Sequence, residues 1–166
     1  IMPAGARLKY RSNVPAYSAF VFESVDPTFA KRAGEARDRG LHNLVVAGLS
    51  YGQGSSREHA ALCPMYLGVK AVLAKAIERI HRANLINFGI IPLIFGDPAD
   101  YDRLTVGALW RVEDVRRAME AGAEEIRLTG PAGEAPIRAR VELTPRQRAI
   151  LLAGGLLNYT RQQGKG

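Results

Sequence analysis

The sequence predicts one α/β domain with a mixed sheet, and three observations lead to this prediction. The chain has 166 residues, a length that suits a single hydrophobic core. Three short apolar runs alternate with stretches of helical spacing between residues 44 and 95, the order expected of parallel β-α-β units. Beyond Gly96 two strand-like segments flank a Gly-Pro turn, which favours an antiparallel pair.

The first forty residues show little periodicity. Residues 7–11 are compatible with a strand or a loop, whereas residues 26–39 are polar with helical spacing. The run 44–49 is apolar at consecutive positions, which predicts a strand buried on both faces. A glycine-rich loop over 50–56 then leads to a helix predicted over 57–67.

The alternation continues with a strand predicted over 69–74, a helix over 77–85 and a strand over 90–95. Pro92 has no backbone N–H to donate, so it predicts that the third strand lies at a sheet edge or a bulge. The last third is expected to hold a short helix and an antiparallel strand pair, over 112–121, 125–128 and 137–143. Thr144 and Pro145 then start a C-terminal helix toward Arg161, which the glycine pair 154–155 is expected to interrupt.

Composition excludes several classes of protein. Apolar residues make up 47% of the chain and charged residues 23%, as in a globular rather than a disordered protein. No apolar run reaches the ~18 residues of a membrane span, and the first residues have no signal-peptide pattern. We therefore expect a cytoplasmic protein with no membrane partner. Cys63 is the single cysteine, which excludes an internal disulfide and a metal site built from several thiolates.

The charge is basic: 23 Lys and Arg against 16 Asp and Glu give a net charge of +7. Such a balance suits nucleic acid, small anions or an acidic partner. The basic residues are dispersed without a run of five, and the aromatic pattern of an RNA-recognition sheet is absent. We expect no nucleic-acid partner. An ordinary solvated surface and a surface that attracts small anions both stay open.

The most informative segment is the loop and helix start that reads GLSYGQGSSREHAAL over residues 48–62. Its glycines allow sharp turns and a close approach of backbone to ligand. Ser55 and Glu58 have the spacing of a capping box, which starts a helix. A helix N-terminus attracts carboxylates or phosphates, and Arg57 is unfavourable there unless an anion lies beside it.

Familiar loop motifs fit this segment poorly. Arg57 stands where a dinucleotide fingerprint needs its third glycine, and the lysine of a phosphate-binding P-loop is missing. Residues 48–52 match the letters of a nucleophile elbow, but the expected helix starts too late and no acid and histidine follow as the rest of a triad. Ser55 and His59 are one helical turn apart, so a Ser–His pair is conceivable, although a core or capping role for His59 is favoured.

The stretch YGQGSSREHAA at 51–61 closely resembles the signature of the C-terminal domain of the aconitase superfamily. The similarity continues in LGVKAVLAK, RIHRANL, GIIPL and DPADY, at 67–75, 79–85, 89–93 and 97–101. It is strong from residue 40 to 101 and weaker on either side. The resemblance implies a single swivelling β/β/α domain over residues 1–166, truncated at its N-terminus because IMPAGA resembles an internal family segment.

By this resemblance the chain is the substrate-binding, base-supplying domain of an aconitate hydratase, a hydro-lyase that isomerises citrate and isocitrate through cis-aconitate by dehydration and rehydration. In the family, three cysteines of other domains hold a four-iron four-sulfur cluster, which Cys63 alone cannot ligate. The expected partners are therefore cluster-bearing catalytic domains, on the same chain or a large subunit, and a small tricarboxylate. The isolated chain is expected to be inactive.

The resemblance implies that Ser55 is the catalytic base and that Arg11, Ser56 and Arg57 bind substrate, with no metal ligand on this chain. The proton to be removed lies beside a carboxylate, so the developing charge must be stabilised. A serine alkoxide needs cations and N–H donors around it, and a guanidinium binds a carboxylate with two parallel hydrogen bonds. Without the resemblance, Arg11 is an ordinary surface arginine and the serines are helix caps.

Other functions stay open. The small subunit of an isopropylmalate isomerase or of a homoaconitase shares the serine signature and is similar in size. An RNA-binding aconitase-like regulator is the alternative of another class, and the net charge of +7 permits it. Outside the loop, we expect His81 to be a structural hydrogen-bonder in a helix and Cys63 to be a small buried apolar residue.

Overall fold

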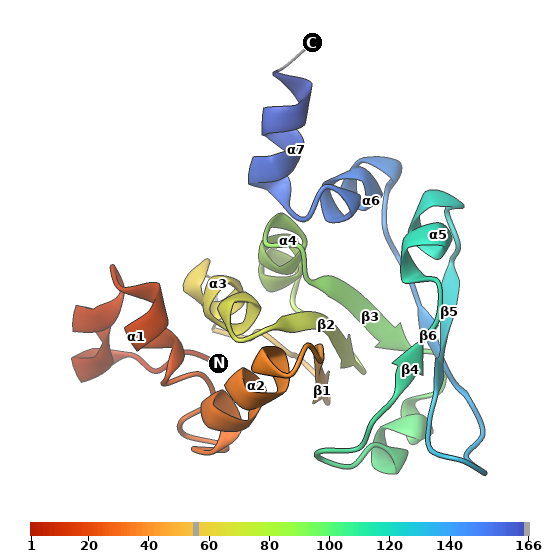
Figure 1. Ribbon diagram of the computed structural model, residues 1–166, viewed down its shortest axis with the longest axis horizontal. Coiled ribbons are helices and arrows are strands. Elements are labelled where there is room, and N and C mark those ends of the chain that lie inside the picture. The colour runs from red at the N-terminus through yellow and green to blue at the C-terminus, as the bar shows by residue number, and fades with distance from the viewer. Residues whose placement is uncertain (55–56, 165–166) are drawn as a thin grey trace.

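A mixed sheet of six strands organises the computed structural model, which describes residues 1–54 and 57–164 (Figure 1). The strand order is β1-β2-β3-β6-β5-β4; the first two pairings are parallel and the other three antiparallel. The strands are Asn43–Ala47 (β1), Val69–Ala74 (β2), Ile91–Phe95 (β3), Arg111–Val112 (β4), Glu125–Thr129 (β5) and Ile137–Arg140 (β6). The predicted α/β class with a mixed sheet is confirmed.

Helices pack around the sheet, and the last one extends away from it (Figure 1). The helices are Val14–Ser18 (α1), Phe29–Asp38 (α2), His59–Tyr66 (α3), Arg79–Asn87 (α4), Val115–Glu120 (α5), Pro145–Leu152 (α6) and Leu156–Gln163 (α7), with 3₁₀ turns at Gly5–Tyr10 (η1) and Pro98–Arg103 (η2). None of the helices in the described part of the chain combines the length and apolarity that a membrane crossing needs.

The core forms where the parallel and antiparallel halves of the sheet meet. Leu73 of β2 and Phe95 of β3 pack in one buried cluster with Leu128 of β5 and Ile137 of β6. Burial alternates strictly along β5 and β6, so one face of each strand is in the core and the other in water. This alternation is the pattern that predicted the antiparallel pair.

The position of β3 differs from the prediction. It lies between β2 and β6, so the sheet-edge or bulge position expected from Pro92 is wrong. Gly96 donates its N–H to Arg138 O across to β6, and N–H groups two residues apart on a strand point the same way. The backbone nitrogen of Pro92 therefore points to the β6 side of β3. On that side only Ile94 and Phe95 are paired with β6, so no partner awaits an N–H at position 92. No hydrogen bond of the ladder is lost.

One expectation for the N-terminal half is corrected and one is confirmed in part. Residues 7–11 fall largely in η1, neither a strand nor an irregular loop. β1 is an edge strand, yet apolar side chains cover both of its faces: Leu44 and Val46 pack on one buried cluster, and Val45 and Ala47 belong to another. Only Val45 is fully buried, so the coverage predicted from the apolar run is present on both faces but partial.

Several boundaries shift for local reasons. α4 starts at Arg79 because Ile77 forms a parallel bridge with Tyr51 instead. The helix predicted over 112–121 is divided: β4 takes Val112, and α5 begins only after Asp114, whose φ of 48° breaks the helix. The interruption expected at the glycine pair 154–155 is confirmed, since it separates α6 from α7.

Candidate functional site

The glycine-rich loop leaves the carboxyl end of β1 with a strongly bent backbone. Ser50, Gly52 and Gly54 have φ values of 54°, 90° and 73°, all in the left-handed region. Gln53 closes a turn by donating its N–H to Ser50 O at 3.0 Å. A left-handed conformation at a residue other than glycine costs about 1–3 kcal/mol. The loop therefore holds Ser50 in an unfavourable backbone conformation.

His81 of α4 packs against the loop. Its side chain is fully buried, and its ring lies 5.1 Å from the Tyr51 ring in an edge-to-face contact. A Cβ at position 52 would lie 2.4 Å from the His81 ring, so Gly52 is required by space as well as by its φ. The structure thus gives His81 a structural packing role beneath the loop.

Two of the predicted substrate residues lie near one helix start. His59, the first residue of α3, has its Nε2 3.0 Å from the backbone oxygen of Arg11, and α1 packs on α3 (Figure 1). Burial raises the pKa of Tyr17 on α1, and Cys63 raises it further. The positive charge of Arg57 lowers it, so Arg57 is close enough to Tyr17 to interact with it electrostatically. The side chains of Arg11 and Arg57 are exposed, and neither has an ion-pair partner among the described residues.

The other two predicted site residues, Ser55 and Ser56, lie outside the described residues. The predicted capping box therefore cannot be located on them. The N-cap of α3 is Glu58, which accepts no side-chain capping bond, and the helix starts at His59 rather than at residue 57. The roles of both serines remain predictions.

The described residues do not fit an iron–sulfur cluster. They contain no group of three or more His, Cys, Asp or Glu side chains that could hold a metal. Cys63 is fully buried in the cluster of apolar side chains between α1 and α3, and burial raises the pKa of its thiol. A neutral, enclosed thiol is a poor metal ligand. The expectation that Cys63 is a small buried apolar residue is confirmed.

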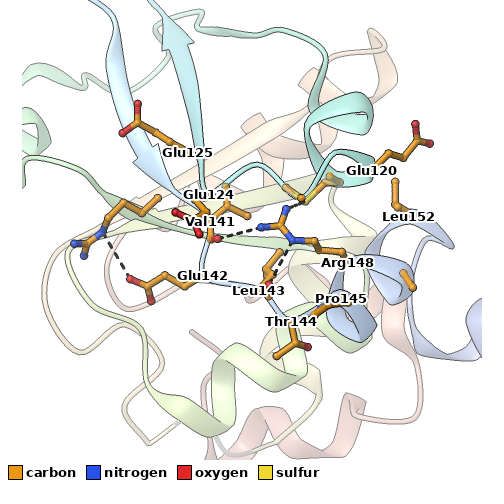
Figure 2. A pocket seen from close by; sticks show the side chains of 14 residues that line it. Glu120, Glu124, Glu125, Val141, Glu142, Leu143, Thr144, Pro145, Arg148 and Leu152 are labelled. Carbon is orange, nitrogen blue, oxygen red and sulfur yellow. Dashed lines mark hydrogen bonds and ion pairs between the residues drawn. The ribbon is translucent and has the colours of Figure 1, made fainter.

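A groove of about 920 Å³ on the described surface shares no residue with the glycine-rich loop (Figure 2). Its lining comes from α5, β5, the end of β6 and α6. Arg148 reaches across it and donates to the backbone oxygens of Ala123, Val141 and Leu143 at 2.7, 3.3 and 3.4 Å. Its guanidinium is occupied by the fold, so the groove is not the candidate site.

A family model described as the aconitase C-terminal domain matches residues 7–98, more than half of the chain. The chain belongs to the aconitase C-terminal domain family. Sequence relatives agree: a putative aconitate hydratase of Emericella nidulans is 35% identical over 95% of this chain. The homocitrate dehydratase of Saccharomyces cerevisiae is 37% identical over 69% of it. This aconitase C-terminal domain spans only 22% and 15% of those two relatives.

The fold has a solved counterpart. The 3-isopropylmalate dehydratase of Methanocaldococcus jannaschii superposes with a TM-score of 0.71 at 30% identity, covering 93% of this chain and 83% of that one. The three relatives are named as a hydratase or a dehydratase, so the chain shares its family and its fold with enzymes of this kind.

The cytoplasmic location expected from the sequence is corrected by these comparisons. The two sequence relatives are named as mitochondrial, and so are the aconitate hydratases of Dictyostelium discoideum and Arthroderma benhamiae. The expectation rested on the lack of a signal-peptide pattern in 166 residues. The chain spans about a fifth of the length of the Emericella nidulans relative, so its residues do not report on targeting signals in the rest of such a protein.

Proposed function

We propose that this aconitase C-terminal domain, over residues 1–166, binds a tricarboxylate and supplies the catalytic base in an aconitate hydratase. The observation that carries the proposal is the meeting of two distant segments. The Arg11 backbone contacts the first residue of α3, two positions after Arg57. The Arg11 backbone thus lies beside the start of the helix that Arg57 precedes, and both arginines are exposed and without ion-pair partners among the described residues.

The chemistry of these residue types suits the reaction. Each guanidinium stays charged at neutral pH and binds a carboxylate with two parallel hydrogen bonds. In the proposal Arg11, Ser56 and Arg57 bind the carboxylates, and Ser55 takes the proton from the carbon beside one of them. Backbone N–H groups of the glycine-rich loop and the charge of Arg57 would stabilise the negative charge that this step creates.

The cofactor of the complete enzyme, a four-iron four-sulfur cluster, is proposed to be held by residues outside these 166. The described residues contain no ligand set for it, so no step through the cluster is assigned to this chain. The cluster-bearing catalytic domains, on the same chain or on a separate large subunit, are the proposed partners.

Ser55→Ala in the complete enzyme tests the proposal directly. Loss of a general base lowers kcat by about 10²- to 10⁴-fold with little change in KM, because the base acts only in the transition state. Steady-state kinetics with citrate and isocitrate give both constants. Thermal unfolding must be measured in parallel, so that a loss of stability is not mistaken for a loss of the base. A near-normal kcat would exclude Ser55 as the catalytic base.

Arg11→Lys tests the carboxylate-binding role. Lysine keeps the charge but cannot form two parallel hydrogen bonds, so we expect a loss of about 2–4 kcal/mol, seen mainly as a higher KM. Arg57→Lys should damage both constants, because Arg57 is proposed to bind substrate and to stabilise the alkoxide. Arg146→Lys on the exposed surface of α6 is the matched control and should leave both constants unchanged. Equal KM values for Arg11→Lys and the control would exclude Arg11 from the site.

A second candidate function is the hydration chemistry of a related substrate. The named relatives include a homocitrate dehydratase and a 3-isopropylmalate dehydratase, and the latter shares the fold over nearly all of this chain. Comparison of kcat/KM for citrate, homocitrate and 3-isopropylmalate decides between them. A preference for either of the last two would replace aconitate hydratase as the proposed activity.

A further inference from the structure

His59 joins two segments that the sequence keeps 48 positions apart. The Nε2 atom of its ring lies 3.0 Å from the backbone oxygen of Arg11, just after η1. The ring also makes an edge-to-face contact with Tyr17, at 5.6 Å between centroids. Tyr17 is itself held, because its ring is buried and its hydroxyl donates to Pro3 O at 3.0 Å. The imidazole is therefore fixed from two sides.

The chemistry of the contact defines the protonation of the ring. A backbone carbonyl can only accept a hydrogen bond, so the Nε2 atom of His59 must carry the proton and donate it. A ring without a donor at that position would leave the Arg11 oxygen without this partner. An amide donor placed where Nε2 lies would preserve the bond. The role of His59 thus depends on one N–H group and on where it is held.

We propose that His59 is a positioning residue for substrate binding, which holds the Arg11 backbone at a set distance from the start of α3 and so from Arg57. The inference rests on the proposed function, in which both arginines bind one tricarboxylate. The backbone contact to His59 ties the position of Arg11 to α3. The exposed Arg11 side chain itself forms no ion pair among the described residues. His59 itself is not required to touch substrate.

The test uses the complete enzyme and three variants of His59. His59→Phe keeps a ring against Tyr17 but has no N–H, whereas His59→Gln places an amide nitrogen close to the Nε2 position. His59→Asn has the same donor one bond too short. We expect His59→Phe to raise KM for citrate about tenfold, the effect of one lost hydrogen bond, with kcat within about twofold. His59→Gln should restore KM and His59→Asn should not.

Two further measurements separate positioning from general stability. Citrate affinity by calorimetry should weaken by the same factor as KM rises, while the exposed His42→Gln, a matched histidine control, changes neither. In an Arg11→Lys background, His59→Phe should raise KM little further, because the carboxylate contact that His59 positions is already lost. If His59→Phe does not fold, the contrast between Gln and Asn still decides.

The inference is overturned if His59→Phe leaves KM and affinity unchanged, if Gln behaves like Asn, or if the two substitutions are fully additive. Failure of the proposed function looks different. If Arg11→Lys itself has no effect on KM, then Arg11 does not bind substrate, and the positioning role of His59 is rejected with it. If Arg11→Lys raises KM and His59→Phe does not, only the positioning role fails.

Discussion

The hydroxyl groups of Tyr17 and Tyr51 differ in one hydrogen bond. The Tyr17 hydroxyl donates to Pro3 O at 3.0 Å, whereas the buried Tyr51 hydroxyl has no hydrogen-bond partner among the described residues. A buried polar atom without a hydrogen-bond partner destabilises the folded protein, so its removal makes the fold more stable. The same substitution at the two positions should therefore have opposite consequences.

We expect Tyr51→Phe to be neutral or to stabilise the fold by up to about 1 kcal/mol, and Tyr17→Phe to destabilise it by about 1 kcal/mol. Chemical unfolding at pH 7 measures both free energies, and each variant serves as the other's control. A clear destabilisation by Tyr51→Phe would show that its hydroxyl has a partner in the folded protein.

The two tyrosines also affect stability at high pH. Burial raises the pKa of Tyr51 well above the ordinary value of 10.0 and also raises that of Tyr17. A group whose pKa is higher in the folded than in the unfolded protein stabilises the fold. This stabilisation is complete below the unfolded pKa and is lost as the pH rises through the folded pKa. The free energy of unfolding should therefore fall above about pH 10, and less steeply in Tyr51→Phe than in the parent protein.

At the scale of the elements, the Arg148 side chain joins α6 to the segments that flank β5 and β6. Arg148 is 8% exposed, and its guanidinium donates to backbone oxygens of the α5–β5 turn and of the chain between β6 and α6. No carboxylate within the described residues forms an ion pair with it. Its contribution is therefore the pairing of backbone acceptors that the fold has removed from water.

Arg148→Met should destabilise the domain by about 3 kcal/mol, because it removes the donor from one buried and two part-buried backbone oxygens. Arg146→Met, two residues earlier on the exposed side of the same helix, should change stability by less than about 0.5 kcal/mol. Unfolding by urea gives both values. Similar costs for the two variants would mean that Arg148 is replaceable by apolar packing.

At the scale of the whole molecule, much of the basic charge is neutralised locally. Within the described residues, ten arginine and lysine side chains form ion pairs with a nearby Asp or Glu. Each such pair adds no net charge, so the net charge of +7 comes from the remaining basic side chains, which are dispersed along the sequence without a run of five. This dispersal is the reason why a polycarboxylate ligand is proposed rather than nucleic acid.

The isolated 166-residue chain is expected to show no hydratase activity with citrate or isocitrate and no visible cluster absorbance, because it has one cysteine. It is also expected to lack submicromolar RNA binding that weakens with added salt, the mark of phosphate contacts. Activity assays, absorbance spectra and a salt titration of RNA binding check these expectations. Activity of the chain alone would overturn the proposed division between this domain and its partners.

Local sequence was enough wherever a structure depends on neighbouring residues. β2 lies over residues 69–74 as predicted, α6 starts at Thr144 with its capping box to Gln147, and the glycine pair 154–155 ends that helix. Periodicity, caps and glycine conformations act within a few positions along the chain. The family was also evident from the sequence, because the motif at 51–61 is contiguous.

Tertiary structure alone set the relations between distant segments. Pairing with β6 made β3 a central strand, and the absence of a further described partner left β1 at the edge. Arg148 is indistinguishable from Arg146 in the sequence, yet only one of them is buried. The contact of His59 with Arg11 O follows the same principle, because a hydrogen bond from a side chain to a distant backbone oxygen leaves no periodic pattern in the sequence.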